Sequence, residues 1–248
     1  MAQSHHRRLI SVSDPDVLAQ TAAEHLVARI AANTGPVAIC LTGGSSPKRL
    51  YALLAREPYK NRIAWNRVHW FIGDERFVPP GDPHHNMTMA RQLLLDQCAP
   101  AANIHPMPTD GPSPEESARR YERKLKSFYG ADQLTNIRPL FDVVLLGIGP
   151  DGHTASLFPD HGALDERKRW VVGVAQAPVE PRVPRVTLTF VALASCREML
   201  FEVAGADKRA ILTRVLAGEN LPANRARSIG ETVLLADEAA LAEELGGR

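Results

Sequence analysis

Residues 141–154 read Phe-Asp-Val-Val-Leu-Leu-Gly-Ile-Gly-Pro-Asp-Gly-His-Thr and decide the fold. Phe141 and the run Val143–Leu146 are apolar, which is typical of a strand buried on both faces of a parallel sheet. The glycine-rich turn that follows should therefore lie at the carboxyl end of that strand, where open α/β sheets bind their ligands. Asp151 and His153 are ionisable residues on this turn and are the first candidates for functional residues.

Gly147, Gly149 and Gly152 have the Gly-x-Gly-x-x-Gly spacing of dinucleotide-binding turns, but the surrounding sequence does not fit that motif. The motif opens a full crossover helix. Here Pro159 would stop a helix begun at Thr154 after little more than one turn. We therefore do not expect a dinucleotide cofactor.

The composition is that of a globular protein without a strong overall charge. The chain has 248 residues, 44% of them hydrophobic, enough for one large α/β domain or two small ones. Because 29 basic residues balance 28 acidic ones, the net charge is +1. This gives no basic field for nucleic acid, so an anionic ligand would have to be bound by a local group of cations.

The cysteines and the N-terminal sequence predict a cytoplasmic protein. Cys40, Cys98 and Cys196 are odd in number and far apart, which favours reduced thiols over a disulfide framework or a zinc site. Residues 1–8 are polar and basic with no apolar segment behind them, and no run approaches 18 apolar residues. We expect a soluble, unsecreted protein that does not bind a membrane.

Short apolar segments alternate with stretches of helical periodicity, which predicts a parallel or mixed sheet covered by helices on both faces. The expected strands are residues 37–41, 68–72, a short one near Ile104, 142–146, 171–175, 186–190, 199–203 and 232–235. The expected helices are residues 15–30, 47–55, 87–98, 114–128, 207–216 and 237–245.

A second glycine-rich turn, Thr42-Gly43-Gly44-Ser45-Ser46-Pro47, joins the first expected strand to a helix. Its two glycines allow backbone N–H groups to converge, its serines add hydroxyl donors, and a helix N-terminus attracts negative charge. The turn therefore predicts an anion site, although the P-loop spacing is absent. The alternative is a tight turn in which a serine only caps the helix.

Cationic side chains lie beside other strand ends. Arg76 follows the strand 68–72 within Asp74-Glu75-Arg76, Arg185 precedes the strand 186–190, and Lys208 follows the strand 199–203. Each taken alone is more typical of a solvated surface charge or a surface salt bridge. Together they could surround a phosphorylated ligand, since arginine suits bidentate phosphate recognition.

His153 is the only obvious general base, because an imidazole titrates near pH 6.5 and can accept a proton from water in the cytoplasm. Asp151 could orient the ring or stabilise its charge; a capping or structural histidine is the alternative. His84-His85 and His161 lack the spacing and partners of a metal site, and Ser156 lacks the Gly-x-Ser-x-Gly elbow. We expect neither a metal nor a serine nucleophile.

Three motifs in order make the chain similar to the 6-phosphogluconolactonases. They are residues 41–47 (Leu-Thr-Gly-Gly-Ser-Ser-Pro), 74–79 (Asp-Glu-Arg-Phe-Val-Pro) and 147–159 (Gly-Ile-Gly-Pro-Asp-Gly-His-Thr-Ala-Ser-Leu-Phe-Pro). Residues 185–189, 205–208 and 221–240 also match, so the resemblance covers nearly the whole chain. The related glucosamine-6-phosphate deaminases share the Gly-x-Asp-Gly-His core but continue with Phe-Asn-Glu-Pro, where this chain has residues 156–159, Ser-Leu-Phe-Pro.

The resemblance implies a single Rossmann-like α/β domain over residues 1–248, a three-layer sandwich with a mostly parallel central sheet flanked by helices. It also implies hydrolysis of 6-phospho-D-glucono-1,5-lactone without a cofactor, by a monomer or weak homo-oligomer whose expected partner is the phosphorylated sugar lactone. By the same resemblance, His153 activates water and Asp151 supports it. The implied substrate-binding residues are Gly43, Gly44, Ser45, Ser46, Asp74, Arg76, Arg185 and Lys208.

Two positions depart from the family pattern. Ser46 stands where threonine is frequent, which preserves the hydroxyl, and His85-Asn86 stands where Ser-Asn is common. The role of His85 is left open, whereas Asn86 is expected to cap the next helix. Two alternative functions remain: a deaminase or isomerase of hexosamine phosphates, which the missing Phe-Asn-Glu-Pro run disfavours, and a non-enzymatic sugar-phosphate sensor, which would not need Asp151 and His153.

Overall fold

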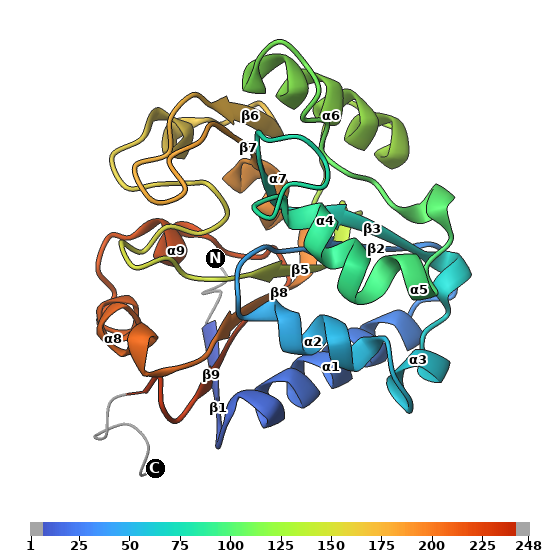
Figure 1. The fold of residues 1–248 in the computed structure, drawn as a ribbon, viewed down its shortest axis with the longest axis vertical. Helices are drawn as coiled ribbons and strands as arrows, with labels where there is room; N and C mark the ends of the chain where they lie inside the picture. Colours follow the sequence, from blue (N-terminus) through green and yellow to red (C-terminus); the bar gives the residue numbers. More distant parts are fainter. Residues whose placement is uncertain (1–6, 242–248) are drawn as a thin grey trace.

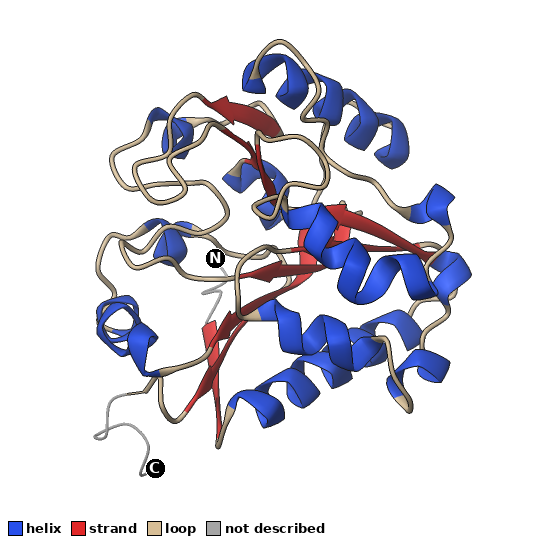
Figure 2. Cartoon of the chain, in the orientation of Figure 1, coloured by secondary structure: helices blue, strands red, loops and turns tan. Residues whose placement is uncertain are grey.

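The structure is a computed structural model that describes residues 7–241, which form two sheets surrounded by helices (Figure 1, Figure 2). The larger sheet has the strand order β1-β9-β8-β5-β2-β3, and every neighbouring pair is parallel. Its strands are β1 (Arg7–Val12), β2 (Val37–Leu41), β3 (Val68–Ile72), β5 (Phe141–Leu146), β8 (Cys196–Val203) and β9 (Glu231–Asp237). The predicted α/β class with a mostly parallel central sheet is confirmed.

The helices are α1 (Pro15–Ala31), α2 (Pro47–Leu54), α3 (Tyr59–Arg62), α4 (Asn86–Ala90), α5 (Asp96–Cys98), α6 (Pro114–Tyr129), α7 (Phe190–Ala194), α8 (Arg209–Leu216) and α9 (Pro222–Arg225). Capping residues set the ends of the long ones: the Asp14 carboxylate accepts the N–H groups of Asp16 and Val17 at the start of α1. Ser113 caps α6 in the same way, and Gly130 ends it with φ +75°. Within residues 7–241, no helix has the length and apolar character needed to span a membrane.

A large hydrophobic core connects the sheets and the helices, and Phe158, Val174 and Ala177 form a second, small cluster. Figure 1 shows α1, α2 and α3 on one side of the larger sheet and β6, β7 and α6 on the other. All six residues of β5 are buried, as the sequence predicts for a central strand. Because β5 lies between β8 and β2, the turn that follows it emerges in the middle of the carboxyl edge of the sheet.

A smaller antiparallel sheet was not expected. It has the order β4-β7-β6, with β4 (Asp74–Arg76), β6 (Val171–Val174) and β7 (Arg185–Leu188). The predicted strands 171–175 and 186–190 therefore do not join the larger sheet. Gly73 is the junction between the two sheets, because its N–H donates to Leu41 O and its carbonyl accepts the N–H of Leu188.

Two predicted strands were wrong in detail. The strand 186–190 ends at Leu188, and Phe190 begins α7, because Thr189 leaves the sheet with its Oγ1 donating to Arg169 O at 2.6 Å. Near Ile104 the chain makes a single bridge to β3 in place of a strand. Short apolar runs of this kind do not distinguish strands from helix starts by periodicity alone.

Two predicted helices also differ from the structure. The helix expected at 87–98 is interrupted by a π-helical turn at 91–95 between α4 and α5. The helix expected at 237–245 does not begin at Asp237, which ends β9 and accepts the N–H groups of Gly205 and Ala240 on its carboxylate. Residues 242–245 of that expected helix lie outside the described residues.

Candidate active site

In the turn after β5, the imidazole of His153 packs against the backbone of Gly149. The N–H of Gly149 donates to His153 O at 2.8 Å, and the N–H of Gly152 donates to Gly149 O at 3.0 Å. Gly152 has φ +86°, a conformation that favours glycine. A Cβ atom on Gly149 would overlap the His153 ring. Of the glycines that resemble a nucleotide motif, Gly149 makes room for the histidine and Gly152 permits the turn that carries it.

Asp151 sets the tautomer of His153. Its Oδ1 lies 2.5 Å from His153 Nδ1 and also accepts the backbone N–H of His153 at 3.1 Å. Partial burial would raise the pKa of Asp151, but the hydrogen bond and charge of His153 outweigh this and lower it. The ionised carboxylate keeps a proton on Nδ1, which leaves Nε2 as the basic nitrogen. Phe158 packs on the ring, with centroids 4.8 Å apart.

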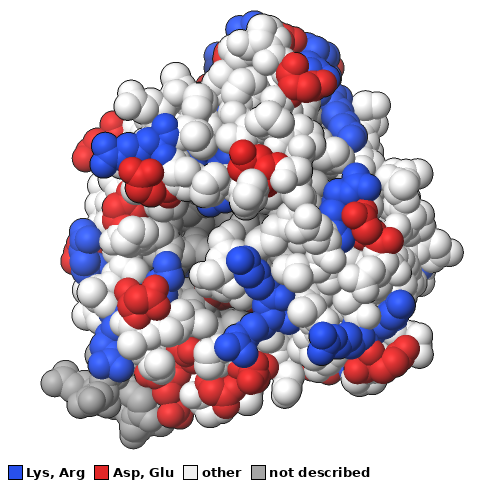
Figure 3. All heavy atoms as spheres, in the orientation of Figure 1, with Lys and Arg blue, Asp and Glu red and all other residues white. Residues whose placement is uncertain are grey.

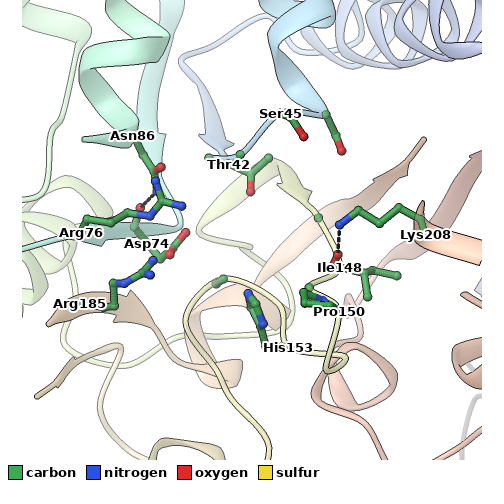
Figure 4. Close-up of a pocket in the computed structure, with 16 residues that line it drawn as sticks. Thr42, Ser45, Asp74, Arg76, Asn86, Ile148, Pro150, His153, Arg185 and Lys208 are labelled. Carbon is green, nitrogen blue, oxygen red and sulfur yellow. Dashed lines mark hydrogen bonds between the residues drawn. The ribbon is translucent and has the colours of Figure 1, made fainter. Parts of the chain in front are cut away.

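The Thr42–Ser46 turn lies between β2 and α2 and faces His153 across a cavity (Figure 4). Gly44 has φ +91°, and a Cβ on Gly43 would overlap the Asn86 side chain. Ser46 occupies the N-cap position of α2 but has helical backbone angles, and its side chain makes no capping hydrogen bond within the described residues. The alternative of a purely capping serine is therefore wrong.

Three cations surround the cavity, each held by backbone carbonyls. Arg76 donates to His84 O at 2.8 Å, Arg185 donates to Pro181 O at 2.8 Å, and Lys208 Nζ donates to Ile148 O at 3.0 Å. Burial lowers the pKa of Arg185, which is only 3% exposed, while nearby Asp74 opposes that effect. None of the three forms a salt bridge in the part of the chain that the structure describes, and all three line the cavity, so their charge can act on an anionic ligand there.

The cavity has a volume of about 210 Å³, and every predicted site residue except Asp151 lines it. Asp151 lies behind His153, in contact with the Nδ1 side of the ring. The predicted residues lining the cavity are Gly43, Gly44, Ser45, Ser46, Asp74, Arg76, His153, Arg185 and Lys208. Sequence reasoning did not assign the other lining residues, which are Thr42, Asn86, Gly147, Ile148, Gly149, Pro150 and Ala155.

Asn86 has a different role from the one expected. His85 is the N-cap of α4, and its Nδ1 accepts the N–H of Thr88 at 3.1 Å, as a serine oxygen at this position would. Asn86 is the first residue of the helix, and its Nδ2 donates to Asp74 O at 3.0 Å. The expectation that Asn86 caps α4 was wrong, because an asparagine at a predicted helix start does not reveal which of two adjacent residues leaves the helical conformation.

His161, another histidine that could suggest a metal, has a structural role. His161 Nδ1 accepts the N–H of Ala163 at 3.1 Å and so caps the short turn 162–165. No group of three or more metal-ligating side chains occurs among residues 7–241. The arrangement can activate water and hold an anion through the protein's own side chains.

Comparison with known proteins gives a consistent family assignment. The model of a family described as "Glucosamine-6-phosphate isomerases/6-phosphogluconolactonase" matches residues 13–234. The chain is 37% identical over 247 residues to a 6-phosphogluconolactonase of Streptomyces coelicolor, covering 95% of this chain and 94% of the relative. It is 40% identical over 220 residues to one of Synechocystis, covering 86% and 87%.

Solved structures agree with this assignment. A 6-phosphogluconolactonase from Trypanosoma brucei has a TM-score of 0.81 at 31% identity, covering 98% of this chain and all of that one. The enzyme from Thermotoga maritima has a TM-score of 0.80 at 30% identity, covering 94% of this chain and all of that one. A monomeric glucosamine-6-phosphate deaminase has a TM-score of 0.78 at 19% identity, covering 94% of this chain and 98% of that one. This likeness shows the shared fold alone.

Proposed function

Because this chain belongs to the glucosamine-6-phosphate isomerase/6-phosphogluconolactonase family, we propose that it hydrolyses 6-phospho-D-glucono-1,5-lactone to 6-phospho-D-gluconate, the second step of the oxidative pentose phosphate pathway. The observation that carries this proposal is the pair of His153 and Asp151, in which Asp151 contacts Nδ1 of the ring, beside a cavity lined by three cations that form no salt bridge within residues 7–241. This arrangement suits an activated ester that carries a phosphate.

In the proposed reaction, His153 Nε2 takes a proton from a water molecule as the water oxygen attacks the lactone carbonyl carbon. Asp151 stabilises the imidazolium that forms. The tetrahedral intermediate then breaks the bond between C1 and the ring oxygen, and that oxygen leaves as the C5 hydroxyl with the proton from His153. The acid product releases a proton to become 6-phosphogluconate. General base catalysis of this kind contributes roughly 10²–10⁴-fold.

The cations and the Thr42–Ser46 turn supply the positive potential that the substrate phosphate and the developing oxyanion require. Binding of the phosphate, which is remote from the reacting carbonyl, contributes orientation. Asp74 cannot bind phosphate because both are negative, so it is suited to accept a hydrogen bond from a sugar hydroxyl.

Lactone hydrolysis is favoured over deamination by the residue beside the base. Phe158 packs against His153 within the Ser-Leu-Phe-Pro segment, where the deaminases continue with Phe-Asn-Glu-Pro. An apolar ring there cannot exchange protons with an amine, so the glutamate of that run has no counterpart at this position. Release of ammonia from glucosamine 6-phosphate would overturn the choice.

The proposal includes a single domain that acts in the cytoplasm as a monomer or weak homo-oligomer. One chain provides every residue of the cavity, and one core connects both sheets. Cys40, Cys98 and Cys196 are free thiols. Sedimentation of the purified protein tests the assembly, and protease digestion that gives two stable fragments would contradict the single domain.

His153→Ala is the direct test of the proposed mechanism. Wild-type protein added to freshly generated 6-phosphogluconolactone should release acid well above the spontaneous rate, and His153→Ala should lower kcat about 10²–10⁴-fold with an unchanged melting curve. His161→Ala is the matched control, since His161 lies outside the cavity and should leave kcat unchanged. Near-normal turnover by His153→Ala would refute the assignment.

A further inference from the structure

The two carboxylate oxygens of Asp74 have different surroundings. Asp74 begins β4, is 6% exposed, and lies at the cavity in Figure 4. Its Oδ2 accepts a hydrogen bond from Ser156 Oγ at 2.6 Å, whereas no hydrogen bond from residues 7–241 reaches Oδ1. One oxygen is therefore held by the protein, and the other is available to a ligand.

Ser156 is placed so that its hydroxyl proton goes to Asp74. The residue is fully buried, and its N–H donates to Thr187 Oγ1 at 3.2 Å. Thr187 lies on β7 directly opposite Asp74 in the smaller sheet. Ala155 precedes Ser156 with φ +49°, a left-handed conformation that is unusual for alanine and turns the chain into the interior. The bond therefore joins the loop that carries the base to the smaller sheet.

We propose that Ser156 is a positioning residue for the lactonase reaction, which directs Oδ1 of Asp74 towards a hydroxyl group of the sugar ring. The inference rests on the proposed function. An ionised carboxylate only accepts hydrogen bonds, so it selects a hydroxyl donor and repels the phosphate. By fixing the carboxylate, Ser156 fixes where that sugar hydroxyl is bound beside the smaller sheet.

The same contact gives a physical meaning to the Ser-Leu-Phe-Pro segment. Ser156 is the first residue at which this segment differs from the Phe-Asn-Glu-Pro run of the deaminases. A phenylalanine at this position has no hydroxyl and could not hold the Asp74 carboxylate. The geometry of Asp74 in this chain therefore depends on a residue that is specific to the lactonase pattern.

The first test is Ser156→Ala, measured with 6-phosphogluconolactone. A hydrogen bond to a charged group contributes more than a neutral one, so KM should rise on the order of 10-fold or more. We expect kcat to stay within about 3-fold and its pH profile to be unchanged, because the base is intact. The hydrogen bond that weakens is the one from the sugar hydroxyl to Asp74, which is made in the bound ground state as well as in the transition state. Ser195→Ala is the control: it also removes a buried hydrogen bond, which Ser195 Oγ accepts from Leu140 N at 2.9 Å, and should lower stability without changing KM.

A double-mutant cycle separates action through Asp74 from a general loosening of the loop. In an Asp74→Ala background, Ser156→Ala should produce no further rise in KM. Should Ser156→Ala fail to fold, Ser156→Cys preserves the size of the side chain and should give the same rise, because a thiol is a weak donor.

Each negative outcome has a distinct meaning. Additive effects in the cycle, or a Ser156→Ala variant with the KM of the wild type, would overturn the positioning role. A wild-type protein that does not accelerate lactone hydrolysis would instead overturn the proposed function.

Discussion

At the scale of single residues, the site depends on side chains that are absent as much as on those that are present. Gly149 allows the His153 ring to lie on the backbone, and Gly43 allows Asn86 to lie against the Thr42–Ser46 turn. The position of His153 and the shape of the cavity therefore depend on two places, Gly149 and Gly43, where a side chain lies directly against glycine backbone.

Gly149→Ala tests this arrangement. Gly149 does not have a positive φ, so alanine fits the backbone, but its Cβ would overlap the imidazole and displace it. A displacement of about 1 Å costs roughly 10²-fold in kcat, and we expect that loss with little change in melting temperature. Gly162→Ala is the control, because Gly162 is exposed and its Cβ would contact no atom within 4 Å. Equal kcat values for the two variants would contradict the account.

At the scale of elements, the Thr42–Ser46 turn is held by α2, the helix that follows it. The Tyr51 hydroxyl accepts the N–H of Thr42 at 3.0 Å and donates to the carbonyl of the same residue at 2.7 Å. Tyr51 is fully buried and Thr42 is 5% exposed, so water does not replace these bonds. One phenol thus ties the end of β2 to α2 and fixes the start of the turn.

Tyr51→Phe should destabilise the protein by about 1–3 kcal/mol, because both backbone groups of Thr42 lose their partner while buried. It should also raise KM, since the turn loses its tie to α2. Tyr121→Phe provides a comparison: its hydroxyl joins Ile72 N and His105 O away from the cavity, so stability should fall while KM stays constant. Chemical denaturation and steady-state kinetics measure the two effects. An unchanged KM in Tyr51→Phe would show that the turn holds its shape alone.

At the scale of the whole molecule, charge is balanced on the surface and costly in the interior. Figure 3 shows Lys, Arg, Asp and Glu intermixed over one face, in keeping with the net charge of +1. In the core, Glu75 accepts the N–H groups of Asn86 and Met87 on its carboxylate. Glu202 on β8 is 1% exposed, and neither of its oxygens has a partner within the described residues.

Glu202 makes stability depend on pH in a specific direction. Burial raises the pKa of Glu202 from 4.5 to about 8. Between these values the unfolded chain has released the proton and the folded protein has kept it, so the free energy of unfolding falls as pH rises from 4.5 to 8. Glu202→Met should remove this component, on the order of a few kcal/mol, and should melt higher than the wild type by an increasing margin from pH 5 to pH 8. If the melting temperatures of the variant and the wild type differ by the same amount at every pH, this account is refuted.

The features predicted correctly from the sequence depend on residues close together in the chain. Periodicity located β2, β3 and β5 and the helices α1 and α6. Glycine-rich turns after β2 and β5 pointed to the carboxyl edge of the sheet, where Ser45 and His153 indeed lie. Local backbone conformation and the burial of a strand are encoded within a few residues, so a single sequence carries them.

Only the tertiary structure decided the features that join distant segments. These include the smaller sheet, the N-cap role of His85, the bond from Ser156 to Asp74 across 82 positions, and the isolation of Glu202. Such pairings depend on which surfaces meet after the chain has folded, and a local pattern cannot specify its distant partner. The sequence by itself pointed to His153 and to the Thr42–Ser46 turn as a site, whereas the tertiary structure decided which side chains hold them in position.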